Sequence, residues 1–115
     1  MARRIRSIKP EIIEPTAIAH GLPLPASGRH KFTYAVTDGE FVKVGRTWHL
    51  PRRLIAIQVA CPRRLRLLGF VASDIERRVH VQLAAVGVVR IVGEWFDFNE
   101  KTIEVLTSAG LCEPT

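Results

Sequence analysis

Cysteine and long apolar runs are what this 115-residue sequence most lacks. Its two cysteines, Cys61 and Cys112, are too few and too far apart for a zinc framework, and no secretory signal opens the chain. We therefore expect a reduced, intracellular setting. Charged residues interrupt every apolar run well short of the roughly 20 residues that cross a bilayer, which predicts no membrane span.

Basic residues outnumber acidic ones, with 17 Lys and Arg against 11 Asp and Glu. The formal charge of +6 favours a polyanion as partner, because each phosphate that a protein neutralises releases condensed counterions. The same charge is also compatible with simple solubility. Arginine suits bidentate phosphate contacts, and six arginines that lie close together in the sequence are candidate DNA-binding residues. They are Arg46, Arg52, Arg53, Arg63, Arg64 and Arg66.

Residues 1–30 combine basic side chains with four prolines, which sets them apart from the rest. Prolines at this density prevent a long helix, so we expect an extended basic arm with at most one short helical turn. Three roles fit such an arm: it lies along a nucleic-acid backbone, it binds a protein partner, or it is a solvated tail. Hydrophobic residues make up 47% of the whole chain, which is sufficient for one small core.

A β-hairpin is predicted at the start of the domain. Two apolar runs, 32–36 and 41–44, flank an Asp-Gly pair, which is the pattern of a type I′ turn with positive φ at both central residues. This hairpin would hold Tyr34 and Lys43 side by side on neighbouring strands. The Gly45-Arg46-Thr47 segment should then end the second strand.

Further elements follow from local signals. Pro51 suits the first turn of a helix over 50–59, and a strand is expected over 65–71. Ser73 and Glu76 have the spacing of a capping box at the start of a second helix. The sequence predicts a short strand or an extended connection over 88–92, a last helix capped by Asn99 that runs to about 108, and a frayed tail over 111–115.

Several motifs occur together in one order. They are Tyr34-Ala35-Val36, Val42-Lys43-Val44-Gly45-Arg46-Thr47, Arg53-Leu54, Glu76 with His80, and Gly93-Glu94-Trp95-Phe96. This ordered set, spread over about residues 31–106, resembles the GIY-YIG nuclease superfamily, in particular its phage-associated T5orf172/MUG113-like branch. The opening ten residues also resemble the start of some phage replication-type proteins. These resemblances suggest phage or prophage origin and hence the cytoplasm of a bacterial host.

The resemblance implies an α+β domain over residues 31–110, with a three-stranded antiparallel sheet flanked by about three helices. It also implies a phosphodiesterase site that uses Mg²⁺ or Mn²⁺. Glu94 would hold the metal, Tyr34 would position or deprotonate the water, and Arg53 would contact the scissile phosphate. Gly45 would permit a tight turn into Arg46. Without the resemblance, Glu94 reads as a surface residue before a core Trp-Phe pair, and Tyr34 as packing.

Three residues allow more than one interpretation. Lys43 departs from the tyrosine that most of the superfamily has, and it could bind phosphate as a point charge, act as a base, or indicate that hydrolysis is lost. Glu76 and His80 lie on one helical face, but the capping box already accounts for Glu76. His80 is equally well explained as a general acid, a phosphate contact or a structural residue, and His49 is a further candidate.

The sequence thus predicts a metal-dependent DNA endonuclease. The alternative is a catalytically inactive module of the same fold that binds nucleic acid or protein, such as a phage-encoded inhibitor of a host system. A homodimer suits so small a domain that cuts duplex DNA, although no residue indicates one.

Overall fold

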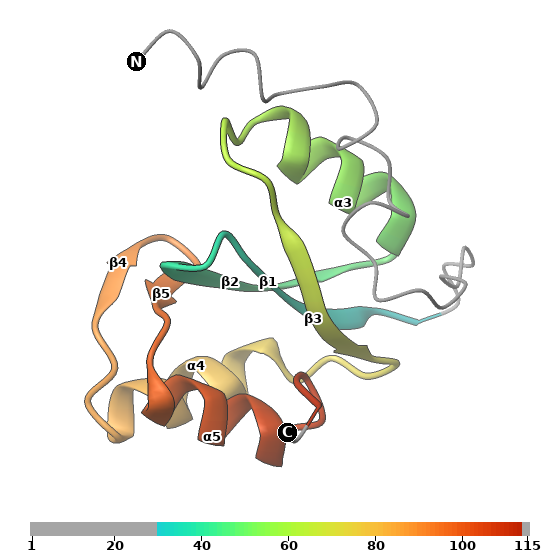
Figure 1. Ribbon diagram of the computed structural model, residues 1–115. Coiled ribbons are helices and arrows are strands. Elements are labelled where there is room, and N and C mark those ends of the chain that lie inside the picture. Colours follow the sequence, from blue (N-terminus) through green and yellow to red (C-terminus); the bar gives the residue numbers. More distant parts are fainter. Residues whose placement is uncertain (1–29, 114–115) are drawn as a thin grey trace, which may run out of the picture.

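A computed structural model describes residues 30–113, so the arm predicted over 1–30 lies almost entirely outside the described residues. Between 30 and 113 the chain forms an α+β fold of five antiparallel strands and three helices (Figure 1). None of these helices has the length and apolarity that a membrane span requires. The elements are β1 (Phe32–Thr37), β2 (Phe41–Thr47), α3 (Leu50–Val59), β3 (Arg66–Val71), α4 (Glu76–Ala85), β4 (Arg90–Val92), β5 (Trp95–Asp97) and α5 (Glu100–Ser108).

The sheet has the strand order β3-β1-β2-β5-β4. Its first three strands are those that the sequence predicts. The expected three-stranded sheet is nevertheless too small, because β4 and β5 form a second hairpin that adds to the edge of β2. Each of these strands has three residues, which is too short for an alternating pattern to be recognised in the sequence.

The first hairpin is confirmed, but two of its details differ. Gly39 has a φ of +102° whereas Asp38 does not have positive φ, so the turn is not type I′. The Asp38 side chain instead accepts hydrogen bonds from the backbone N–H groups of Glu40 and Phe41, at 2.9 and 2.8 Å. Tyr34 pairs with Gly45, and Lys43 pairs with Val36, so Tyr34 and Lys43 are diagonal neighbours on one face.

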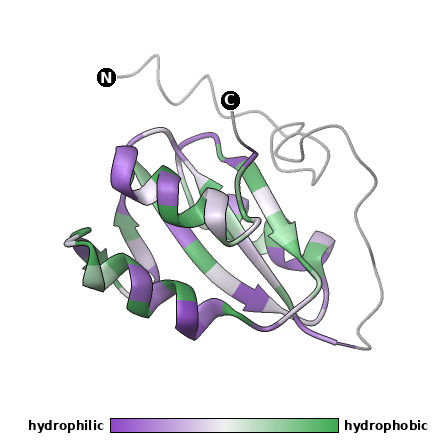
Figure 2. Cartoon of the chain, turned by 90° about the horizontal axis from the view of Figure 1, so that it is seen from below, coloured by the Kyte–Doolittle hydropathy of each residue, from purple (hydrophilic) through white to green (hydrophobic). Residues whose placement is uncertain are grey.

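The helices cover both faces of the sheet (Figure 1). Helix α3 packs on one face, and α4 and α5 pack on the other, where hydrophilic and hydrophobic residues alternate along the two helices (Figure 2). All six residues of β1 are buried between these layers. The core against α3 includes Tyr34, Val36, Leu54, Ile57 and Leu67, and the core against α4 and α5 includes Ala35, Val44, Val79, Leu83 and Leu106.

The predicted capping box at Ser73 and Glu76 does not form. Helix α4 has Ile75 at its N-cap position and lacks a side-chain cap of its own. The hydroxyl of Thr33, on β1, accepts a hydrogen bond from the Ile75 N–H at 2.9 Å and donates one to the Ser73 carbonyl at 2.7 Å. Thr33 of β1 therefore caps the start of α4 in place of Ser73, and the Glu76 carboxylate is not used in the cap.

The end of the described chain is better ordered than the sequence suggests. Asn99 caps α5 as predicted, through a capping box with Thr102. Leu111, expected to lie in a frayed tail, is fully buried, and its N–H donates to the Leu106 carbonyl at 2.8 Å. Its backbone packs against Gly69 of β3, where a Cβ would lie only 2.7 Å from the Leu111 carbonyl oxygen.

Candidate active site

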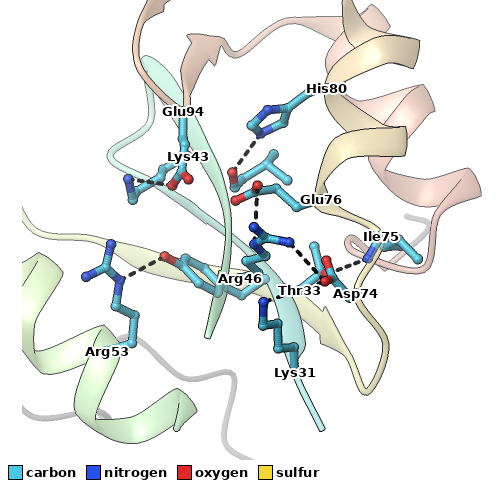
Figure 3. A network of polar contacts seen from close by, with 12 residues as sticks. Lys31, Thr33, Lys43, Arg46, Arg53, Asp74, Ile75, Glu76, His80 and Glu94 are labelled. Carbon is cyan, nitrogen blue, oxygen red and sulfur yellow. Dashed lines mark hydrogen bonds and ion pairs between the residues drawn. The ribbon is translucent and has the colours of Figure 1, made fainter. Parts of the chain in front are cut away.

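Most of the predicted site residues meet at one edge of β2. Pairing between β5 and β2 ends at Lys43, so the part of β2 after this residue is not paired with β5. Side chains come to it from the α3 side of the sheet and from the α4 side (Figure 3). The two sets of side chains approach each other around Gly45.

Gly45 matters because it lacks a side chain. A Cβ on this residue would lie 2.7 Å from the Cζ atom of Tyr34, closer still to the phenolic oxygen, and 2.9 Å from Oε1 of Glu94. The expected tight turn into Arg46 is absent, since β2 runs on to Thr47 and φ at Gly45 is not positive. Because Gly45 has no side chain, the Tyr34 hydroxyl and the Glu94 carboxylate can both lie next to its Cα atom.

Tyr34 and Arg53 form a pair across the α3 face. Nε of Arg53 donates to the phenolic oxygen of Tyr34 at 3.4 Å. Burial raises the pKa of Tyr34, and the hydrogen bond from Arg53 only partly offsets this effect. The phenol therefore stays protonated near neutral pH, which suits it to orient a water rather than to deprotonate it.

Arg52 and His49 have other surroundings. Arg52 is exposed, and its backbone N–H donates to Nδ1 of His49 at 3.2 Å. His49 is thereby the N-cap of α3. Of the two adjacent arginines, Arg53 is the one that faces the site, as the sequence predicts.

Glu94 and Lys43 form an ion pair of 3.0 Å, and the Lys43 side chain is only 13% exposed. The Lys43 ammonium also lies 5.7 Å from the centre of the Trp95 ring. The ammonium thus has both an anionic and an aromatic neighbour. Lys43 belongs to the same cluster as Tyr34 and Glu94.

Glu76, which the sequence predicts to be part of a capping box, lies beside these residues. Its Oε2 atom is buried and, when both carboxyl groups are ionised, has no hydrogen-bond donor, whereas its Oε1 atom lies 3.8 Å from Nε of Arg46. The helical spacing to His80 was the signal for this role, but the apparent capping box supplied a competing explanation. The Glu76 and Glu94 side chains come from different elements and lie close enough for a hydrogen bond (Figure 3).

The two carboxyl groups share a proton. Burial, with the hydrogen bond and negative charge of Glu94, raises the pKa of Glu76 to about 7. Burial also acts to raise the pKa of Glu94, but the hydrogen bond from Glu76 and the Lys43 ammonium outweigh it and lower that pKa. Near neutral pH, one carboxylate is therefore ionised and its neighbour is only partly so.

His80 has a structural environment. One ring nitrogen, Nε2, lies 2.8 Å from the Val44 carbonyl oxygen, and because a carbonyl only accepts, Nε2 carries the hydrogen. The other nitrogen, Nδ1, lies 3.3 Å from Nη2 of Arg90, and the ring packs on Phe96. Both nitrogens are occupied, so this arrangement favours the structural reading, in which His80 ties α4 to β2.

The remaining arginines divide into two groups. Arg46 is close to the site and forms an ion pair with Asp74 at 3.0 Å as well as approaching Glu76. Arg63 lies at the tip of the first hairpin, where it forms ion pairs with Asp38 and Glu40. Arg64 and Arg66 are exposed beside the same tip and line a hollow of about 330 Å³. Six arginines that are close in sequence therefore do not form one surface around the site.

A divalent cation fits the pair Glu76 and Glu94. Within residues 30–113 no group of three or more His, Cys, Asp and Glu side chains is arranged to hold a metal. Mg²⁺ needs fewer protein ligands, because it keeps several waters and takes oxygens from its substrate. A cation between the two carboxylates would give the buried Oε2 of Glu76 the partner it lacks.

Comparison with protein-family models, with curated proteins and with solved structures returned no match to this chain.

Proposed function

We propose that this protein is a metal-dependent endonuclease of the GIY-YIG type, which hydrolyses DNA phosphodiester bonds with Mg²⁺ or Mn²⁺. The observation that carries the proposal is the pair of adjacent carboxyl groups, Glu76 and Glu94, in which the buried Oε2 atom of Glu76 has no donor once both groups are ionised. A buried anionic oxygen without a partner is costly unless a ligand completes it. Tyr34, Lys43 and Arg53 lie beside this pair, and they would add a phenol and two cations that can contact a phosphate.

Glu76 and Glu94 would hold the cation together. Bound there, Mg²⁺ or Mn²⁺ polarises a phosphoryl oxygen and lowers the pKa of a bound water. The two residues would hold a cation only with both carboxyl groups ionised, so Glu76 would have to give up the shared proton. The Lys43 ammonium, which now pairs with Glu94, would then be available to a phosphate oxygen.

Tyr34 and Arg53 would act on the substrate directly. The Arg53 guanidinium uses its Nε–H on Tyr34 and has further N–H groups that can bind two phosphate oxygens. Tyr34, held by that bond and by burial, would place the attacking water in line with the scissile bond. The net charge of +6 supplies attraction to the DNA backbone.

One observation favours the second candidate, a module that binds nucleic acid or protein without hydrolysis. The Lys43 ammonium neutralises Glu94 at 3.0 Å and so competes with a cation for the same oxygen. In that case, the fold and basic surface would serve recognition alone, as in an inhibitor encoded by a phage.

The two functions are separated by incubating the protein with supercoiled plasmid in Mg²⁺ or Mn²⁺, beside Glu94→Gln and Glu76→Gln. We expect nicking that EDTA abolishes and that either substitution lowers by at least about 100-fold, because each removes a charged ligand. Arg53→Ala should lower the rate by about 100-fold or more through loss of the phosphate contact. The matched control, Arg52→Ala, should change it little.

Thermal unfolding gives an independent readout. A rise in melting temperature with Mn²⁺ that disappears in Glu94→Gln supports the metal site. Salt-sensitive DNA binding without nicking, and without a stabilising effect of Mn²⁺, would establish the binding module instead.

A further inference from the structure

A pocket of about 240 Å³ opens beside the candidate active site, between α3 and the start of β5. Two of its lining residues, Lys43 and Arg53, belong to the site itself. The other lining residues come from the second half of α3, from the two positions that follow it and from β5, and they are mostly apolar. They are Ala56, Ile57, Ala60, Cys61 and Trp95.

The walls of this pocket combine an aromatic ring with small side chains. Trp95 is partly exposed, and two of the other lining residues, Ala56 and Ala60, have small side chains. Ile57, which is 8% exposed, forms part of the apolar wall. A flat aromatic group can stack on the indole ring of such a pocket, whereas an aliphatic chain cannot stack.

The two basic lining residues, Lys43 and Arg53, indicate which kind of aromatic group would fit. Lys43 and Arg53 line the pocket on the side that faces Glu94 and Tyr34. A phosphate bound by these two residues would place its own nucleoside next to the pocket. An aromatic base joined to a phosphate therefore matches both parts of the surface, the apolar wall and the basic rim.

We propose that this pocket binds the base of the nucleotide that adjoins the scissile phosphate, and that the substrate is DNA with an unpaired, unstacked base. The proposal rests on the proposed nuclease function and adds the class of substrate. In an intact duplex the base is stacked and paired, so it has to be extruded before it enters a side pocket. A single strand, or a duplex with a bulged nucleotide, offers the base without that cost. Stacking on Trp95 would tolerate any base, because every base has a π face.

Binding without metal tests the pocket apart from catalysis. The chain has two tryptophans, so Trp48→Phe leaves Trp95 as the single tryptophan, whose fluorescence can be excited apart from that of Tyr34. In EDTA, an oligonucleotide of eight thymidines should quench this fluorescence and bind about tenfold more tightly than eight abasic sites of equal charge. Ala56→Leu, which fills the pocket from an exposed helical position, should remove most of this preference. Ala84→Leu, the same change on the exposed side of α4, should retain it.

Two results would overturn the base pocket. One is equal affinity for the thymidine and abasic oligonucleotides, and the other is a preference that Ala56→Leu leaves unchanged. Neither result bears on whether Glu94 is needed for nicking, so the pocket and the nuclease function fail separately. For the substrate class, a duplex with one bulged thymidine should be cut about tenfold faster than the fully paired duplex. Equal rates on the two duplexes would overturn that part of the proposal.

Discussion

Gly45 shows how one missing side chain can shape a site. A Cβ at this position would overlap the Tyr34 phenol and touch the Glu94 carboxylate. We therefore predict that Gly45→Ala lowers the free energy of unfolding by about 1–3 kcal/mol, as overpacking of a buried position does, and abolishes nicking. Urea denaturation and the plasmid assay measure the two effects.

Tyr34→Phe provides the control for this prediction. It removes the phenolic oxygen, which is the atom nearest to the added methyl group, but leaves the ring carbon 2.7 Å away. Gly45→Ala should therefore cost less stability in the Tyr34→Phe background than in the wild type. Equal costs in both backgrounds would show that the strain arises elsewhere.

The sequence predicted that Tyr34, Lys43, Arg53 and Glu94 belong to one site, and these four residues do lie together. It did so through the order of motifs along the chain rather than through their distances. The place of Glu76 was missed because its two neighbours in the site, Glu94 and Arg46, are distant in sequence, whereas a capping partner was only three residues away. Local spacing cannot distinguish an acid that caps a helix from one that points into a site.

Helix α4 depends on a hydroxyl from β1 for its first turn. Thr33 is fully buried and bonds both the Ile75 N–H and the Ser73 carbonyl. Thr33→Val keeps the shape but leaves these two groups unpaired, so we predict a loss of about 1–3 kcal/mol in unfolding free energy. Thr33→Ser, which keeps the hydroxyl, should retain both bonds and lose less stability in urea denaturation. The opposite ranking would mean that packing of the methyl group matters more than the cap.

Helices α3 and α5 could be placed from the sequence because their end signals are local, namely Pro51 and Asn99. The hairpin of β4 and β5 was only partly anticipated. Its three-residue strands are stabilised by pairing with β2, and this contact is not visible in a short stretch of sequence. The turn at Asp38 differed for a similar reason, because side-chain hydrogen bonds replaced the expected positive φ.

The stability of the whole molecule should depend on pH through Glu76. Its pKa of about 7 in the folded protein lies above the ordinary 4.5, so its contribution to stability is complete below about pH 4.5 and is lost as pH rises through 7. In EDTA, the unfolding free energy of the wild type relative to Glu76→Gln should therefore fall between about pH 5 and pH 8. Urea denaturation across this range measures the difference.

A matched control for this pH dependence is Glu104→Gln, on the exposed side of α5. It should follow the wild type over the whole range. The lowered pKa of Glu94 acts only below about pH 4.5 and leaves this window unaffected. Parallel curves for the wild type and Glu76→Gln would contradict the shared proton.

The bond from Thr33 to Ile75 spans 42 residues, and it has a consequence for the order in which the protein acquires its site. The segment that begins after β1 contains both Glu76 and Glu94, but neither would be held in place before β1 docks against α4. A contact so distant in sequence requires a long loop to close, which slows its formation. A chain emerging from the ribosome would therefore bring Glu76 and Glu94 together only when the sheet is complete, and a partly folded chain would lack the site that the proposed nuclease requires.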